Sequence, residues 1–119
     1  MKEKSYEAYG IFFETLANQN RLHIINALRG GEKNVSEIIA KTALEQTCVS
    51  HCLARLERCG FVTQRRHGKF KVYALNLDTI APLMRIIDKH TNAYCSHLIG
   101  EAHAVKPQRG SRKTKRMKT

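Results

Sequence analysis

Apolar residues recur every three or four positions through the amino-terminal quarter of the chain. One stripe occupies residues 3–16, and a second occupies residues 22–28 and ends at the glycine pair 30–31. Residues at these steps lie on one side of an α-helix, so the stripes predict two amphipathic helices. The polar stretch 18–21, Asn-Gln-Asn-Arg, separates them and offers capping side chains.

Two further helices are predicted in the middle of the chain. Asn34 stands three residues before Glu37, which is the spacing of a capping box at a helix start, and residues 38–40 are apolar. A longer helix is predicted over residues 45–59, where the pattern ends before Gly60. Its core side carries Val49, Leu53 and Leu56, at steps of four and three.

The pattern then changes from helical to extended. Residues 61–66 and 70–75 contain β-prone side chains, and residues 67–69, His-Gly-Lys, supply a turn between them, so we expect a β-hairpin. A last helical stripe runs over residues 79–98, with Pro82 in its first turn, where a missing N–H costs little. The predicted fold is mainly α-helical, with about five helices and one β-hairpin.

The order helix, turn, helix, hairpin is that of a winged helix-turn-helix, whose second helix enters the major groove of DNA. On a helical wheel of residues 45–59, a polar and basic side lies about 100° to 200° from the core residue Val49. Hydroxyl, imidazole and amide groups can bond base edges, and Ala54 permits a close approach. An ordinary solvated helix face is the alternative. We assign DNA contacts on this helix to Gln46, Thr47, Ser50, His51 and Arg58.

Basic residues crowd the tip of the predicted hairpin. Side chains of this kind bind DNA phosphates, which positions a protein on the duplex without specifying the sequence. A solvated run of charges is the alternative, but it explains neither the clustering nor the place beside a polar helix face. We assign phosphate contacts to Arg65, Arg66, Lys69 and Lys71, with His67 among them.

The chain of 119 residues carries 21 Lys and Arg against 10 Asp and Glu, which favours a polyanionic partner. Charge alone does not separate nucleic acid from an anionic membrane surface, whereas the element order favours DNA. Residues 1–105 are expected to form one DNA-binding and dimerisation domain, and the basic residues 106–119 a disordered tail. No run is long and apolar enough for a membrane span or a signal peptide, so we expect a cytoplasmic protein.

Three segments together resemble the ArsR/SmtB-type repressors of bacteria and archaea: residues 16–25 (LANQNRLHII), 45–62 (EQTCVSHCLARLERCGFV) and 65–75 (RRHGKFKVYAL). The resemblance covers about residues 9–98. It implies a homodimer built from the first and last helices, which binds an imperfect operator palindrome and is released by an inducer. The sequence itself also predicts an interaction surface, because a small domain has few residues that could cover the aromatic side chains of Tyr6, Tyr9, Phe12 and Phe13.

The metal sites familiar in that family are incomplete in this chain. The thiolate pattern Cys-Val-Cys-Asp-Leu corresponds to residues 34–38, Asn-Val-Ser-Glu-Ile, in which both cysteines are missing. The zinc pattern Asp-x-His begins at Asp78 but has Ile80 in place of the histidine. One interpretation of the last helix is a variant metal site on one of its sides. The alternative is that its histidines are ordinary solvent-exposed residues. The candidate ligands of the metal site are His90, His97 and Glu101.

Three cysteines line the side of residues 45–59 next to the core, and all four cysteines are expected to be reduced. Simple packing is one interpretation, because free cysteine behaves as a small apolar residue. The other is a thiol sensor at Cys48 and Cys52, which lie one helical turn apart and could share a metalloid or meet an oxidant. The helix dipole should make Cys48 the easier thiol to ionise and Cys59 the harder one.

These patterns predict a sequence-specific DNA-binding transcriptional regulator, a homodimeric repressor whose inducer is a metal, a metalloid or a thiol-reactive compound. No organic cofactor is expected. A nonspecific architectural DNA- or RNA-binding protein is the alternative. An enzyme is disfavoured, because the sequence has neither a nucleophile elbow nor paired carboxylates.

Overall fold

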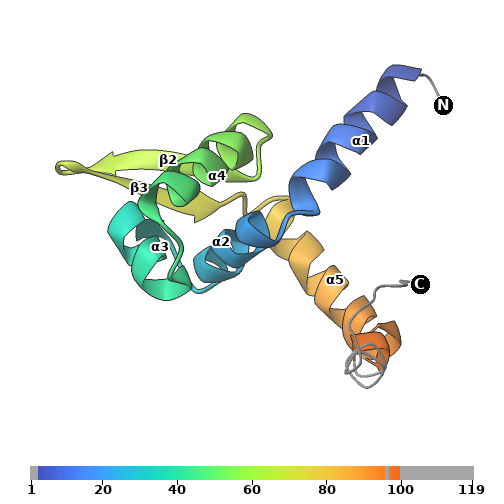
Figure 1. Ribbon diagram of the computed structural model, residues 1–119. Coiled ribbons are helices and arrows are strands. Elements are labelled where there is room, and N and C mark those ends of the chain that lie inside the picture. The colour runs from blue at the N-terminus through green and yellow to red at the C-terminus, as the bar shows by residue number, and fades with distance from the viewer. Residues whose placement is uncertain (1–2, 96, 100–119) are drawn as a thin grey trace. The chain divides into compact units, whose positions relative to one another are not determined.

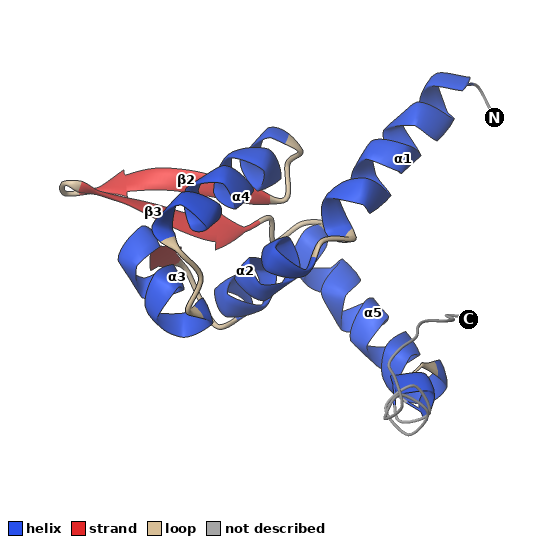
Figure 2. Ribbon diagram, in the orientation of Figure 1, coloured by secondary structure: helices blue, strands red, loops and turns tan. Residues whose placement is uncertain are grey.

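The computed structural model describes residues 3–95 and 97–99. Its described backbone falls into two units that divide after Ala81. The first holds most of the secondary structure (Figures 1 and 2). In chain order the elements are α1 (Glu3–Leu16), α2 (Gln19–Arg29), β1 (Lys33–Asn34), α3 (Val35–Thr42), α4 (Gln46–Arg58), β2 (Val62–His67), β3 (Phe70–Leu75) and α5 (Ile80–Tyr94).

The core of the first unit lies among α2, α3, α4 and the sheet. The apolar stripes predicted from the sequence point inward, and each of these elements contributes completely or almost completely buried side chains. Burial of this area is the main stabilising contribution to the fold. The most deeply buried apolar residues are Ile24, Ile25, Ile38, Val49, Leu53, Leu56, Phe61 and Val62.

The helix starts follow the capping chemistry predicted from the sequence. Asn18 begins α2, and its Oδ1 accepts a hydrogen bond from the backbone N–H of Arg21 at 3.0 Å. Asn34 and Glu37 form a complete capping box at the start of α3, with bonds of 2.9 and 2.8 Å. These bonds satisfy backbone N–H groups that a helix leaves free in its first turn. Both predicted starts are therefore confirmed.

The predicted β-hairpin is confirmed, and it belongs to a three-stranded antiparallel sheet with the order β1-β3-β2. Gly68 takes the turn between β2 and β3 with a φ of 65°, a left-handed conformation that glycine adopts without strain. The strand β1 was not predicted. It has only the two residues Lys33–Asn34, too few to show an alternating pattern.

The first helix of the chain is only partly covered. Phe12 packs against Phe61, with ring centroids 5.1 Å apart. In contrast, Tyr6, Tyr9 and Phe13 are exposed by 61%, 49% and 61%. Of the four aromatic residues expected to need cover, Phe12 thus packs on the core. Tyr6 and Tyr9 contact each other and Phe13 contacts Phe12 edge-on, but these three side chains form a stripe that stays largely exposed.

The helix α5 begins at Ile80, next to the predicted start at residue 79, and Pro82 lies in its first turn as predicted. Asn76 Oδ1 accepts hydrogen bonds from the backbone N–H groups of Asp78 and Thr79 just before the helix. The helix ends at Tyr94, short of the predicted residue 98, although residues 97–99 are again helical. The expected tail 106–119 lies outside the described residues. Within residues 3–95 and 97–99, no helix combines the length and apolar character needed to cross a membrane.

Candidate nucleic-acid interface

Helix α4 has a buried side and an exposed polar side, as predicted. Val49 and Leu56 are completely buried and Leu53 almost so. The four residues assigned to base contacts near the amino end of the helix are all exposed. They occupy the first two turns of α4, and Ala54, also exposed, follows one turn later. The structure therefore brings together Gln46, Thr47, Ser50 and His51 on one solvent-facing surface.

The turn between α3 and α4 holds this surface away from the core. Residues 43–45 connect the two helices, and Ala43 closes α3 in a left-handed conformation with a φ of 62°. Non-glycine residues adopt this conformation uncommonly, so the sharp turn has an energetic cost. In compensation, the N–H of Ala43 bonds the carbonyl of Ile39 at 2.7 Å and completes the end of α3.

Arg58 lies apart from the other assigned residues of α4. It follows Gln46 by twelve positions, which is about 18 Å along a helix axis. Its side chain lines a cavity with residues of α1 rather than the exposed polar surface at the amino end. A DNA contact by Arg58 is therefore separate from the group of four, and it stays a prediction.

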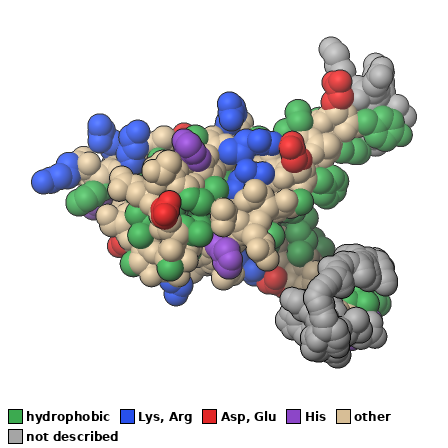
Figure 3. All heavy atoms as spheres, in the orientation of Figure 1, with side chains coloured by type: hydrophobic (Ala, Val, Ile, Leu, Met, Phe, Trp, Pro, Cys, Tyr) green, Lys and Arg blue, Asp and Glu red, His purple; other side chains and the backbone are tan. Residues whose placement is uncertain are grey.

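The hairpin of β2 and β3 forms the wing, which extends beyond α3 and α4 (Figure 1). Basic side chains gather at its outer end (Figure 3). Arg66 and Lys71 lie directly opposite each other in the strand register, and Lys69 lies in the turn. Like charges at opposing positions repel each other across a strand pair, so a nearby anion would relieve this arrangement.

Arg65 differs from its neighbour Arg66, because successive side chains of a strand point to opposite faces. Arg65 Nη2 donates a hydrogen bond to Glu32 Oε2, which makes a salt bridge to the segment before β1. Its charge is therefore already partly compensated. Sequence reasoning missed this pair, whose members are separated by 33 positions.

A second contact missed by sequence reasoning connects the wing to α4. Gln64 Nε2 donates to both carboxylate oxygens of Glu57, at 3.1 and 3.0 Å. Gln64 lies in β2 and Glu57 in the last turns of α4. The bond helps to fix the orientation of the wing relative to the exposed helix surface.

Cys48 and Cys52 lie on the side of α4 next to the core, the first half-buried and the second 8% exposed. Burial, reinforced by the neighbouring Cys48, raises the pKa of the Cys52 thiol to about 11. The two thiols are thus close enough to interact. Cys52 is thus a buried thiol that stays protonated at neutral pH.

Cys59 contradicts the expectation from the helix dipole. Burial acts to raise the pKa of its thiol, but hydrogen bonds with Thr15 and Arg55 and the charges of Arg55 and Arg58 outweigh it. The pKa of Cys59 therefore lies below its ordinary value, although the residue ends α4 where the dipole disfavours an anion. The prediction that Cys59 is hard to ionise is wrong, because two arginines from its own helix and a threonine from α1 surround it.

The predicted metal site on the last helix is only partly described. His90 and His97 are exposed, and the ring of His90 packs on Tyr94 with centroids 4.8 Å apart. Glu101 lies outside the described residues. Among residues 3–95 and 97–99, no three His, Cys, Asp or Glu side chains are grouped so that they could hold a metal ion.

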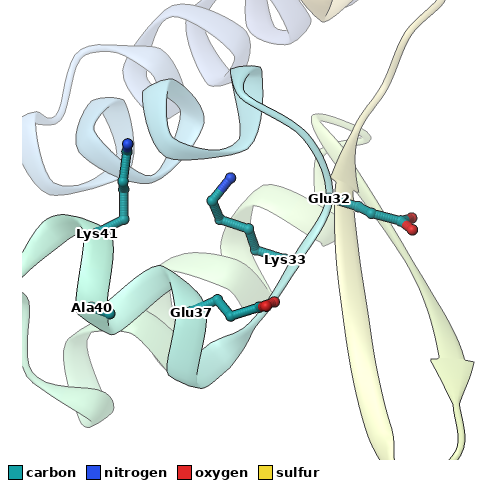
Figure 4. Close-up of a pocket in the computed structure, with 5 residues that line it drawn as sticks. All are labelled: Glu32, Lys33, Glu37, Ala40 and Lys41. Atoms are coloured by element: carbon teal, nitrogen blue, oxygen red, sulfur yellow. The ribbon is translucent and has the colours of Figure 1, made fainter.

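A cavity of about 390 Å³ lies beside α3, lined by Glu32, Lys33, Glu37, Ala40 and Lys41 (Figure 4). The ends of Lys33 and Lys41 point in the same direction, whereas Glu32 points away from them toward the hairpin. Lys33 Nζ donates to the carbonyl of Gly31 at 3.2 Å, and Glu37 serves the capping box. Three of the charged side chains here, those of Glu32, Lys33 and Glu37, thus already bond other groups of the chain.

The comparisons with known proteins bear on this arrangement. The family model for the bacterial regulatory protein, arsR family, matches residues 18–64, from the start of α2 into the wing. Over 88 residues the chain is 32% identical to Rv0081 of Mycobacterium tuberculosis, an uncharacterized HTH-type transcriptional regulator, covering 73% of this chain and 77% of the relative. The chain belongs to the arsR family. It is accordingly a DNA-binding transcriptional regulator with a winged helix-turn-helix fold, as predicted.

Solved structures agree with this assignment. The crystal structure of Rv0081 superposes with a TM-score of 0.75 at 29% identity, covering 82% of this regulator and 99% of that chain. The solution structure of the homodimeric winged helix-turn-helix DNA-binding domain of Mb0332 from Mycobacterium bovis gives a TM-score of 0.72 at 26% identity, covering 82% and 92%. A probable mercury resistance operon repressor of Streptomyces lividans is 32% identical over 75 residues, covering 63% of this regulator and 60% of that protein.

Proposed function

We propose that this regulator is a homodimeric repressor that reads a palindromic operator with α4 and holds the DNA backbone with its wing. The observation that carries the proposal is the exposed polar surface of Gln46, Thr47, Ser50 and His51, on a helix whose opposite side is buried. These side chains offer donors and acceptors of the kind that distinguish base pairs in the major groove. Their position at the amino end of α4 is the part of a recognition helix that contacts bases.

The wing contributes affinity rather than sequence preference. Arg66 and Lys71 are opposed across the two strands, and Lys69 extends the positive charge to the turn. Phosphate oxygens between such groups would offset their repulsion and release condensed counterions from the DNA. We assign Arg65 a smaller share, because it already pairs with Glu32.

Dimerisation is supported by the exposed stripe of Tyr6, Tyr9 and Phe13 on α1. Apolar surface of this kind on a small protein marks an interaction site. The homodimeric domain of Mb0332 covers 82% of this regulator, which favours a second copy as the partner. Two copies of α4 would read two half-sites about one turn of DNA apart.

We infer that a thiophilic ion, rather than zinc, is the inducer, and that it binds at Cys48 and Cys52. The interaction between the two thiols supports this idea. With a pKa of about 11, Cys52 carries little thiolate at neutral pH, so an ion that displaces the thiol proton suits the pair better than an oxidant that needs a free thiolate. The relative named for mercury resistance is consistent with such chemistry.

We assign no catalytic activity to the protein and place it in the cytoplasm with its DNA. The test of the operator hypothesis is selection of bound fragments from genomic DNA, followed by titration of the selected site and of random DNA at one salt concentration. We expect the selected site to be palindromic and to bind at least about 10³-fold more tightly than random DNA. Equal affinities would favour the alternative, a nonspecific architectural DNA- or RNA-binding protein.

A further inference from the structure

A second cavity, of about 540 Å³, lies between α1 and the carboxyl end of α4. Its volume is in the range of small-molecule sites, about 300–1,000 Å³. The lining comes from three segments of the first unit and combines apolar with basic side chains. Its residues are Ala8, Ile11 and Phe12 of α1, Arg55, Arg58 and Cys59 at the end of α4, and Phe61 just before β2.

One wall of this cavity is apolar and firmly placed. Phe12 and Phe61 pack against each other with centroids 5.1 Å apart and ring planes inclined by 31°. Phe61 is almost completely buried in the core, so it anchors the wall, whereas Ile11 is 53% exposed beside it. A hydrocarbon body placed against these side chains would be removed from water, and so would they.

The lining of the cavity also includes two basic residues, Arg55 and Arg58. Arg55 Nη2 lies 3.3 Å from Glu14 Oε1, so one guanidinium has a carboxylate partner. Arg58, three residues later on α4, has no carboxylate partner within the described part of the chain. The cavity thus keeps one uncompensated positive charge. The pKa of the Cys59 thiol is a second sign of positive potential there. Burial acts to raise this pKa, but the hydrogen bond with Thr15 and the effects of Arg55 and Arg58 lower it by more.

The cavity uses a different side of α1 from the exposed aromatic stripe. On a helical wheel, Ile11 and Phe12 lie within about 60° of Ala8. Tyr6, Tyr9 and Phe13 lie between about 100° and 160° from Ala8 on the same wheel. A second copy of the chain packed on the stripe would therefore contact a different side of the helix from the one that lines the cavity.

We infer that this cavity binds a small organic anion, a monocarboxylic acid with an aliphatic body. The carboxylate bonds the guanidinium of Arg58, with Arg55 beside it, and the hydrocarbon body lies on Ile11, Phe12 and Phe61. A guanidinium matches a carboxylate with two parallel N–H donors, which favours this anion over a simple halide. A carboxylate bound in this cavity would neutralise positive charge on α4. Because the proposed function has α4 contact the bases of the operator, the bound acid would weaken DNA binding, and only this consequence rests on the proposed function.

The test is calorimetric titration of the full-length protein, without DNA, with octanoate, its neutral analogue octanamide, and acetate, which lacks the apolar body. We expect octanoate to bind, octanamide to bind at least about fivefold more weakly, and acetate to give no measurable heat. The variant Arg58→Gln should weaken octanoate binding by a similar factor. Lys41→Gln, which removes one positive charge at the other cavity, should leave it unchanged.

The site is located by mass spectrometry after alkylation with N-ethylmaleimide. Octanoate should slow modification of Cys59, which lines the cavity, and leave modification of Cys95 unchanged. The proposal is overturned if octanoate gives no heat at millimolar concentration, if octanamide binds equally well, if Lys41→Gln weakens binding as much as Arg58→Gln, or if Cys59 is not protected. Because no DNA is present, these results do not depend on the operator hypothesis.

Discussion

Cys52 lies within α4 and Cys59 caps the carboxyl end of the same helix, but the two thiols have opposite electrostatic surroundings. Around Cys52 the dominant influence is burial, which favours the neutral thiol and raises its pKa to about 11. Around Cys59, burial is outweighed by Thr15, whose Oγ1 lies 3.4 Å from the sulfur, and by the arginines on the last turn of α4. Neighbouring side chains therefore decide the chemistry of these thiols, and the helix dipole is a smaller influence.

We predict that iodoacetamide modifies Cys59 well before Cys52 in the folded protein at neutral pH. The thiolate is the reactive form, and a pKa of about 11 leaves only about one Cys52 in ten thousand ionised at pH 7. Peptide mapping of samples quenched over time measures both rates. In urea the two rates should become similar, and faster modification of Cys52 than of Cys59 without urea would contradict the assignment.

Two further single substitutions, Ser50→Ala and His51→Ala, should each weaken operator binding more than random-DNA binding. The difference should be about 1 to 3 kcal/mol for each side chain that bonds a base well. Both side chains are exposed, so their removal leaves the core intact. Fluorescence anisotropy with operator and random duplexes at one salt concentration measures the difference. Equal weakening on both duplexes, with an unchanged melting temperature, would argue against α4 as the reader.

At the scale of the element, the alternation of strand side chains divides the arginines of the wing. Arg66 shares a face with Gln64 and, through the register, with Lys71, while Arg65 faces the other way and pairs with Glu32. Gln64 in turn bonds Glu57 of α4. One residue of this strand face, Gln64, thus bonds α4, and the next residue on the same face, Arg66, carries a positive charge.

We predict that Arg66→Ala and Lys69→Ala weaken binding to operator and random DNA alike and reduce the dependence of affinity on salt by about one counterion each. Arg65→Ala is the matched control, because its pairing with Glu32 should make its effect smaller. Titrations over a range of salt concentrations measure the slopes. A changed sequence preference with an unchanged slope would show that the wing reads bases instead.

The elements themselves could be predicted from the sequence because their signals are local. The caps at Asn18 and Asn34, the stripe of α4 and the turn at Gly68 each depend on residues only a few positions apart. The strand β1 could not be predicted, because two residues become a strand only through the pairing of Lys33 with Tyr73 and of Asn34 with Val72. Such pairing has no local signature.

At the scale of the whole molecule, the candidate interface was predictable in part for the same reason. A helical wheel places Ser50 and His51 opposite the core without further knowledge of the fold. The pairs Arg65–Glu32 and Cys59–Thr15 join segments 33 and 44 positions apart, and these pairs determine which charges are free and which thiol ionises. Their chemistry depends on tertiary contacts, which spacing along the chain does not reveal.

The exposed aromatic stripe of α1 leads to the last prediction, that Phe13→Glu converts the dimer to a monomer. Phe13 is 61% exposed, so the change does not disturb the core, but it places a charge where a partner would have to bury it. Removing one buried aromatic side chain from an interface alone costs about 1.5 to 3 kcal/mol, more than tenfold in the dissociation constant. Light scattering coupled to gel filtration, over a dilution series, measures the mass.

Phe70→Glu is the control for this experiment, because Phe70 is an aromatic residue of similar exposure, 52%, at the tip of the wing. It should stay dimeric at every concentration at which the unmodified protein does. The Phe13→Glu monomer should also lose affinity for the full palindrome while keeping weak binding to a half-site, since each subunit retains its own α4. If Phe13→Glu stays dimeric at high dilution, the partner surface lies elsewhere than on α1.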